Sequence, residues 1–264
     1  MDLTNVYIGF ALATFAGLST GIGSLLGLYS KFENKRLLSL ALGFSAGVMI
    51  YVSFMELLLL SFESLVGLYG YTYGQLIGVT AFISGLLMML FIDQLFDHHS
   101  IADFISRSSN KDESLLVRTG LFSAIALAIH NFPEGFATFT AAVYDPTVGV
   151  TLATAIAIHN IPEGLAVSVP IYYATKNKAK AFWISFASGL AEPLGALVGF
   201  LIFRTVYNEA LFGVSFALCA GIMIYVSLNE LLPVAKEYGK PSDPIIGVTA
   251  GIIVMAISLI LMYA

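Results

Sequence analysis

The chain has 264 residues, of which 58% are hydrophobic and 11% are charged, and its mean hydropathy is +0.88. Because soluble domains carry about 25% charged residues, this composition excludes a soluble globular protein and indicates a membrane protein, with no nucleic acid among its partners. The net charge of −5 indicates little by itself. Cys219 is the only cysteine, which excludes an internal disulfide and a thiolate metal site.

Eight apolar segments follow one another, and each is near or above the ~20 residues that a helix needs to cross a bilayer. We expect helices at about 4–29, 36–60, 72–96, 117–143, 147–175, 180–206, 210–234 and 244–263. The connections are too short for a soluble domain, so residues 1–264 are expected to form a single polytopic domain of the all-α membrane class. The first residues lack the basic segment of a signal peptide, so we expect the first helix to stay as an anchor.

Lysine and arginine are distributed unequally between the two ends of these helices. Of the 12 basic residues, all except Arg204 lie in or beside the four connections on one side. Cytoplasmic connections of membrane proteins carry an excess of basic residues. The sequence therefore places these connections in the cytoplasm and both termini outside it, in a multi-pass protein of the cell (inner) membrane.

Short words recur between the two ends of the chain. The matches are 46–53 (AGVMIYVS) with 220–227 (AGIMIYVS), 77–81 with 246–250 (both IGVTA) and, more weakly, 17–23 with 189–195. Glu56 and Glu230 extend the first match. Helices one to three thus resemble helices six to eight, around a central pair formed by helices four and five. Because matched helices would cross the membrane in opposite directions, this pattern predicts the inverted repeat of many secondary transporters.

One six-residue word occurs in both central helices, as HNFPEG at 130–135 and as HNIPEG at 159–164. On a helix, positions i, i+1 and i+4 fall at about 0°, 100° and 40°, so the histidine, asparagine and glutamate of each copy share one face. The proline before each glutamate cannot bond the carbonyl four residues back. This predicts helix kinks that free the carbonyls of Ile129 and Ile158. Imidazole, amide oxygen and carboxylate together are a set of metal ligands.

Glu192 adds a third carboxylate, which Pro193 follows at another expected helix break. An uncompensated charge at a helix centre costs about 2.5–3.5 kcal/mol, and the central parts of these helices offer no basic partner. Either the acids are protonated or a cation lies among them, and the neighbouring imidazoles favour a cation. These ligands suit Zn²⁺, Fe²⁺, Mn²⁺ or Co²⁺ and argue against Cu⁺. Two divalent ions would leave the three acids about one charge positive, and one ion would leave them about one charge negative.

Other polar residues have simpler interpretations. The connection at 97–116 contains Asp97, His98, His99 and Asp103. It could collect metal on the cytoplasmic side, but a solvated loop is the simpler interpretation. Asp93 is interpreted as an interfacial residue, and the roles of Glu56 and Glu230 stay open.

The two words, the Glu192–Pro193 pair and the eight helices with outside termini resemble those of the ZIP metal transporters, most closely their bacterial ZupT-type branch. The resemblance covers the whole chain. It implies a transporter without a cofactor, which carries zinc, and with broad selectivity iron, manganese, cobalt and cadmium, into the cytoplasm through a binuclear centre at the bilayer midplane. Family roles place one ion at His130, Glu134, His159 and Glu163, and the second at Asn131, Glu134, Asn160, Glu163 and Glu192. Asn229 stands before Glu230 where many relatives have a histidine, which weakens the expectation of a strong inner exit site.

Other functions stay open at this point. An intramembrane metalloenzyme would need a catalytic water and a base, as in His-Glu-x-x-His, but each word has a single histidine. A structural scaffold does not explain the buried ligand set. Export is compatible with the same residues as import, because ligands do not encode direction. The preferred ion, the energy coupling and the formation of a homodimer also stay open.

Overall fold

A computed structural model describes residues 2–29, 35–95, 111–206 and 208–263. All regular structure within these ranges is helical. The elements are α1 (Leu3–Tyr29), α2 (Lys35–Val52), η1 (Ser53–Leu57), α3 (Leu58–Tyr69), α4 (Tyr71–Leu95), α6 (Lys111–Tyr144), α7 (Pro146–Thr175), α8 (Lys178–Gly189), α9 (Ala191–Thr205), α10 (Glu209–Val226), η2 (Ser227–Leu231), α11 (Leu232–Tyr238) and α12 (Asp243–Tyr263). The loop residues from Asp97 to Asp103 lie outside the described residues, so the prediction of a solvated loop stays a prediction.

The described helices form eight consecutive units, as the sequence predicts, because three units consist of pieces that continue one another. These composite units are α2–η1–α3, α8–α9 and α10–η2–α11. Seven of the eight are long and apolar enough to cross a membrane. The eighth is α6, which begins with the charged residues Lys111, Asp112 and Glu113. The prediction of an all-α membrane protein is therefore confirmed at the level of its helices.

Two helix boundaries differ from the predicted ones for a local reason. The predicted helices 36–60 and 210–234 continue to Tyr69 and Tyr238, and each contains one π-helical turn, η1 or η2. In the first unit the chain then reverses at Gly70, whose φ of 77° favours glycine. Both π turns occupy matched positions of the repeated words, and they carry Glu56 and Glu230. Single π turns inside α-helices often occur at functional sites.

Proline has different effects at its three expected helix breaks. Near Glu192, the helix does end at Gly189 and begins again at Ala191. In contrast, α6 and α7 continue through Pro133 and Pro162 without interruption. One missing N–H removes only one backbone hydrogen bond, and the buried neighbours hold both helices in register. The freed carbonyls of Ile129 and Ile158 stay a prediction.

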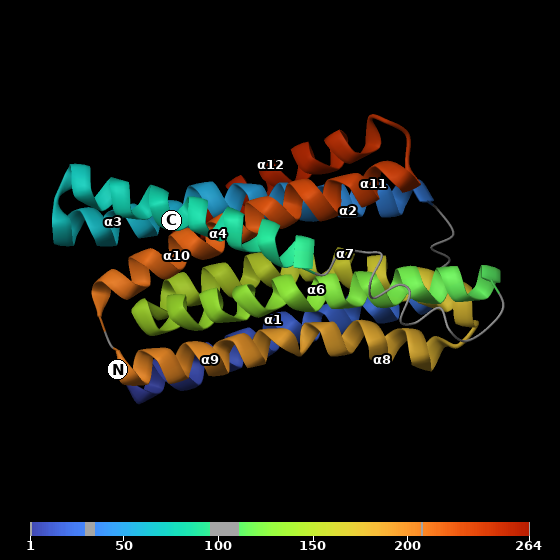
Figure 1. Cartoon of the computed structure of the whole chain (residues 1–264), viewed down its shortest axis with the longest axis horizontal. Helices are drawn as coiled ribbons and strands as arrows, with labels where there is room; N and C mark the ends of the chain where they lie inside the picture. Colours follow the sequence, from blue (N-terminus) through green and yellow to red (C-terminus); the bar gives the residue numbers. More distant parts are fainter. Residues whose placement is uncertain (1, 30–34, 96–110, 207, 264) are drawn as a thin grey trace.

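The helices pack in two groups (Figure 1). One contains α1, α6, α7, α8 and α9, and the other contains α2, α3, α4, α10, α11 and α12. The groups meet mainly where α2 packs on α7 and where α10 packs on α6. Both ends of the chain lie at the same end of the bundle, as an even number of crossings requires. The central helices α6 and α7 therefore lie between the remaining helices of both groups.

Close backbone approach holds α6 and α7 against their neighbours. A Cβ atom at Gly135 would collide with the carbonyl oxygen of Glu192, and a Cβ atom at Gly164 would collide with that of Thr20. Small residues permit such contacts between membrane helices. The final glycine of each repeated word thus permits close contact of α6 with α9 and of α7 with α1. This fixes the depth of the polar side chains that precede it.

Candidate metal centre

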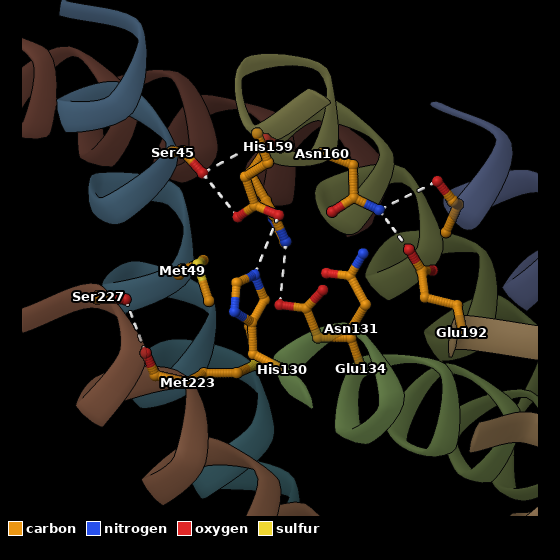
Figure 2. A network of polar contacts seen from close by, with 12 residues as sticks. Ser45, Met49, His130, Asn131, Glu134, His159, Asn160, Glu192, Met223 and Ser227 are labelled. Atoms are coloured by element: carbon orange, nitrogen blue, oxygen red, sulfur yellow. Dashed lines mark hydrogen bonds and ion pairs between the residues drawn. The ribbon is translucent and has the colours of Figure 1, made fainter. Parts of the chain in front are cut away.

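The structure brings all seven predicted site residues together in the interior of the bundle, and Figure 2 labels all of them except Glu163. Each is at most 3% exposed. Six of them come from α6 and α7, and Glu192 comes from the first turn of α9. They are His130, Asn131, Glu134, His159, Asn160, Glu163 and Glu192. Such a concentration of buried polar groups is costly unless the groups pair with one another or with a ligand.

The histidines and glutamates of the two words pair across the α6–α7 interface. His130 Nε2 lies 3.3 Å from Glu163 Oε2, and His159 Nε2 lies 3.2 Å from Glu134 Oε1. Within one helix the two side chains are four residues apart and share a face. Because α6 and α7 pack side by side, the histidine of each copy meets the glutamate of the other. The repeated word therefore builds two equivalent imidazole–carboxylate pairs.

The asparagines are oriented by backbone carbonyls of the flanking helices. Asn131 Nδ2 donates to the carbonyl of Ser188 at 3.4 Å, and Asn160 Nδ2 donates to the carbonyl of Ala16 at 3.0 Å. Asn160 Nδ2 also donates to Glu192 Oε1. With their nitrogen atoms held in this way, both amides direct their oxygen atoms elsewhere.

Four buried oxygen atoms of this cluster have no hydrogen-bond donor within the described part of the chain. They are Asn131 Oδ1, Asn160 Oδ1, Glu134 Oε2 and Glu192 Oε2. Leaving a buried acceptor without a donor costs about 1–3 kcal/mol, and native proteins contain few such groups. Four acceptors on neighbouring side chains form a region of negative potential. Such acceptors suit cations as ligands.

Two residues that were not among the predicted site residues also contact the cluster. Ser45 of α2 donates from its Oγ to Glu163 Oε1 at 3.2 Å and to the carbonyl of His159 at 3.3 Å. Glu230 of η2 lies with its Oε2 3.6 Å from His130 Nδ1. The match between Glu230 and Glu56 was a signal for Glu230. Ser45 gave no comparable signal, since a serine in an apolar helix usually bonds its own backbone.

Asp93 also has a defined role in packing. Tyr225 donates from its hydroxyl to Asp93 Oδ2 at 2.8 Å, and Asn229 Nδ2 donates to the same oxygen at 3.2 Å. The carboxylate therefore joins α4 to α10 and η2, beside Glu230. This contact adds an interhelical function to the interfacial position predicted for Asp93.

As arranged, the site residues are hydrogen-bonded partners and do not form a ready coordination sphere. Among the described residues, no group of three or more His, Cys, Asp or Glu side chains has the arrangement that would hold a metal ion. In the two histidine–glutamate pairs (Figure 2), Nε2 and a carboxylate oxygen bond to each other. Metal binding at these atoms requires both hydrogen bonds to be exchanged for metal–ligand bonds.

Comparisons with known proteins assign the family. A model of the ZIP zinc transporter family matches residues 98–259. A protein called zinc transporter ZupT from Chlorobium chlorochromatii is 52% identical over 263 residues, which cover 97% of this chain and 98% of that protein. A protein of the same name from Chlorobaculum parvum is 49% identical over 263 residues, which cover 97% of this chain and 98% of that protein. Another from Oceanobacillus iheyensis is 47% identical over 267 residues, which cover 98% of this chain and 100% of that protein. This chain belongs to the ZIP family.

Membership in the ZIP family confirms several predictions from the sequence. ZIP proteins are transporters, so the interpretation as a transporter and not an enzyme is confirmed. The family, together with the seven apolar helices, makes the chain a multi-pass membrane protein. The site residues belong to α6, α7 and α9, which lie inside the region matched by the ZIP family model.

Proposed function

We propose that this chain carries divalent metal cations, with zinc as its main cargo, across the cell (inner) membrane into the cytoplasm. Three similar proteins carry the name zinc transporter, and zinc prefers the imidazole and carboxylate ligands that this cluster offers. The main support within the molecule is the set of four buried acceptor oxygens without a donor, next to two histidine–glutamate pairs. Iron, manganese, cobalt and cadmium are further cargo ions that the same nitrogen and oxygen ligands suit.

The proposed centre is binuclear. One ion would bind His130, Glu134, His159 and Glu163, and the second would bind Asn131, Glu134, Asn160, Glu163 and Glu192. Glu134 is well placed to bridge the ions, because its Oε1 faces His159 while its Oε2 is without a donor. Glu163 is more tightly held, since its two oxygens contact His130 and Ser45. The two glutamates would therefore contribute unequally.

Glu230 changes the charge balance of the proposed centre. The three carboxylates considered from the sequence would leave two divalent ions about one charge in excess. Glu230 is a fourth carboxylate, and its Oε2 lies 3.6 Å from His130 Nδ1. Four carboxylates balance two divalent ions. Buried charges are favourable in a region of low dielectric constant only when opposite charges compensate them. One divalent ion would leave two of the four carboxylates uncompensated, so the charge balance supports two ions.

The packing of the helices supports an inverted repeat and alternating access. α2 packs on α12, and its sequence counterpart α10 packs on α4. In the same way α1 packs on α7 while α9 packs on α6, and α2 packs on α7 while α10 packs on α6. If each helix is replaced by its matched helix, every one of these packing pairs becomes the other member of its set. A two-fold axis in the membrane plane would produce this relation. We propose that the site opens alternately to each side through relative motion where α2 meets α7 and α10 meets α6.

The proposed orientation has both termini outside and the basic connections in the cytoplasm, on the asymmetry of lysine and arginine. Single cysteines at residue 2 and at residue 110, in a chain with Cys219→Ala, test it in intact cells. We expect an impermeant thiol reagent to label residue 2 and to label residue 110 only after the cells are opened. The reverse pattern would overturn the orientation and, with it, the argument for import.

Metal accumulation in cells that lack their own zinc transporters tests the function. We expect expression of the chain to raise zinc uptake, and unlabelled iron, manganese, cobalt or cadmium to compete. Glu134→Gln should remove this uptake, whereas Glu63→Gln, at an exposed acid of α3, is the matched control and should retain it. Equal uptake by cells with and without the chain, at verified membrane insertion, would refute the proposed function. Purified protein in vesicles with a zinc gradient of either sign then separates import from export.

A further inference from the structure

Thr20 differs from most helical threonines of this chain. A buried helical threonine normally donates from its hydroxyl to the carbonyl four residues before it. Eight helical threonines, exposed or buried, do so, namely Thr14, Thr80, Thr140, Thr151, Thr154, Thr175, Thr205 and Thr249. Of the four described threonines that are fully buried, Thr140 and Thr151 do so, and Thr20 and Thr138 do not. Thr20 is completely buried, and its hydroxyl has no hydrogen-bond partner within the described residues. Its natural acceptor, the carbonyl of Ala16, instead accepts from Ser19 at 2.6 Å and from Asn160 at 3.0 Å.

The Thr20 side chain lies against the end of α8, where the asparagine of the first repeated word is also bound. A Cβ atom at Gly189 would be 3.1 Å from Thr20 Oγ1, so the hydroxyl lies against the backbone there. The carbonyl of the preceding residue, Ser188, accepts the hydrogen bond from Asn131 at 3.4 Å. The hydroxyl of Thr20 thus lies against Gly189, the residue that follows the acceptor of the Asn131 amide. Asn131 Oδ1 is one of the four oxygens without a donor.

Thr20 also occupies the position that corresponds to Glu192 in the weak match of 17–23 with 189–195. Contacts of the two segments agree with this match. The carbonyl of Thr20 touches Gly164 as that of Glu192 touches Gly135. The carbonyls four residues earlier, at Ala16 and Ser188, accept from the two asparagines.

The corresponding side chains differ in length. The carboxylate of Glu192 reaches Asn160, whereas the threonine hydroxyl is two atoms closer to its backbone and has no partner. Two further atoms would extend a side chain by roughly the length of one O–H···O hydrogen bond, ~2.8 Å. A water molecule on the Thr20 hydroxyl would therefore place an oxygen at about the distance from the backbone that a glutamate carboxylate reaches. That oxygen carries no formal charge.

We propose that Thr20 is a positioning residue of the oxygen-rich part of the cation site, where its hydroxyl holds a water ligand of the second ion. This inference rests on the binuclear centre proposed above. In this arrangement the second ion receives a carboxylate from Glu192 on one side and a neutral water on the other. The site then keeps a partly hydrated ion, and the number of carboxylates stays matched to two divalent charges. Residues that orient metal ligands typically change metal affinity by about 10–100-fold when they are replaced.

Two matched pairs of proteins test this role. Thr20→Val keeps the shape of the side chain and removes the hydroxyl, so it is compared with the unchanged chain. Thr20→Ala and Thr20→Ser differ from each other only by the hydroxyl, which keeps the test valid if valine fails to fold. Thr151→Val is the control, because Thr151 is a buried threonine that bonds its own helix on α7. For each purified protein, zinc binding is titrated with the metal alone, and the melting temperature is measured in a chelator.

We expect Thr20→Val to lower the affinity for the second zinc ion by about tenfold and to leave the affinity for the first unchanged. Its melting temperature without metal should not fall, because the hydroxyl that it loses has no partner. Thr20→Ser should bind the second ion more tightly than Thr20→Ala, and Thr151→Val should bind both ions like the unchanged chain. Normal binding of both ions by Thr20→Val, or equal binding by the serine and alanine variants, would overturn the inference. An unchanged chain that binds a single zinc ion would instead refute the binuclear centre on which the inference rests.

Discussion

The two copies of the His-Asn-x-Pro-Glu-Gly word are held by equivalent contacts but have different surroundings. Each histidine meets the glutamate of the other copy, at 3.3 Å and 3.2 Å. Each asparagine donates to a backbone carbonyl of a flanking helix, at 3.4 Å and 3.0 Å. The same six residues thus produce the same local geometry on α6 and on α7. The histidine–glutamate pairs thus form between the two words themselves, whereas the asparagine contacts also need the carbonyls of α1 and α8.

The neighbouring helices then make the copies unlike. The copy on α7 is hydrogen-bonded to α2 and α9, because Ser45 donates to Glu163 and Asn160 donates to Glu192. The copy on α6 has looser partners. Cys219 contacts the carbonyl of Pro133 at 3.6 Å, and Glu134 keeps one oxygen without a donor. The comparison shows that repeated residues set the positions of the ligands, while residues outside the words decide which ligand atoms are free to bind.

The largest expected effect is the loss of either glutamate of the words. Glu134→Ala and Glu163→Ala should each reduce zinc uptake by at least about 100-fold, since each removes a ligand that both ions share. Uptake is measured in cells with the amount of inserted protein quantified. Glu63→Ala, at an exposed acid, should take up zinc normally. Near-normal transport by a well-expressed Glu134→Ala variant would contradict the bridging role.

The conservative change sharpens the comparison between the copies. A glutamine at position 134 or 163 keeps the size of the side chain and removes its charge. Because Glu163 is held by both His130 and Ser45, whereas Glu134 has an oxygen available to bridge, we expect Glu134→Gln to lower zinc uptake more than Glu163→Gln. Uptake rates at equal protein levels decide the order. The opposite order would mean that the free oxygen of Glu134 is not the bridging atom.

The next effect in size concerns Glu192, which only the second ion would use. Glu192→Gln should bind one zinc ion per chain instead of two, because a second divalent charge would lack its carboxylate in a region of low dielectric constant. It should keep some transport if the ion at the two histidines is the one carried. Elemental analysis of purified protein at saturating zinc gives the count. Two ions in Glu192→Gln would remove this residue from the second site.

Glu230 should have a smaller effect, since it contacts the site from η2 at 3.6 Å. Glu230→Gln keeps the shape and removes the charge that faces His130, so we expect about tenfold weaker zinc binding. Glu237→Gln changes an exposed acid of α11 and serves as the control. Titration of both purified variants with zinc measures the difference. Equal affinities would show that Glu230 does not contribute to the charge balance of the centre.

The sequence predicted the helical units, and it singled out seven residues that lie together in the interior of the bundle, because both depend on local patterns. Apolar length identifies a membrane helix, and the spacing of the word fixes which side chains share a face. The π turns and the contact of Ser45 were not predictable in this way. Ser53 and Ser227 lie in the same helical units as Ser45 and Glu230, and each bonds its own helix at 2.7 Å. Only the packing of α2 on α7 distinguishes Ser45 from these serines.

The smallest expected effect compares Ser45 with Cys219, which corresponds to it at the offset of the longest repeated word. Ser45→Ala removes hydrogen bonds to Glu163 and to the carbonyl of His159. A single hydrogen bond contributes about 0.5–1.5 kcal/mol net, so zinc binding should weaken by about 2–10-fold as Glu163 loses its orientation. Cys219→Ala removes only a weak thiol contact with Pro133, and its affinity for zinc should stay within about twofold.

Titrations of these two variants, with Ser53→Ala as the control for a serine that bonds its own helix, measure this difference directly. We expect Ser45→Ala to bind zinc more weakly than either of the others, and Ser45→Thr to recover part of the loss, because its hydroxyl can still donate to the carboxylate. If Cys219→Ala were the weaker binder, the copy on α6 would be the one that depends on its neighbours. Glu163, and not Glu134, would then be the glutamate with an oxygen available to bridge the two ions.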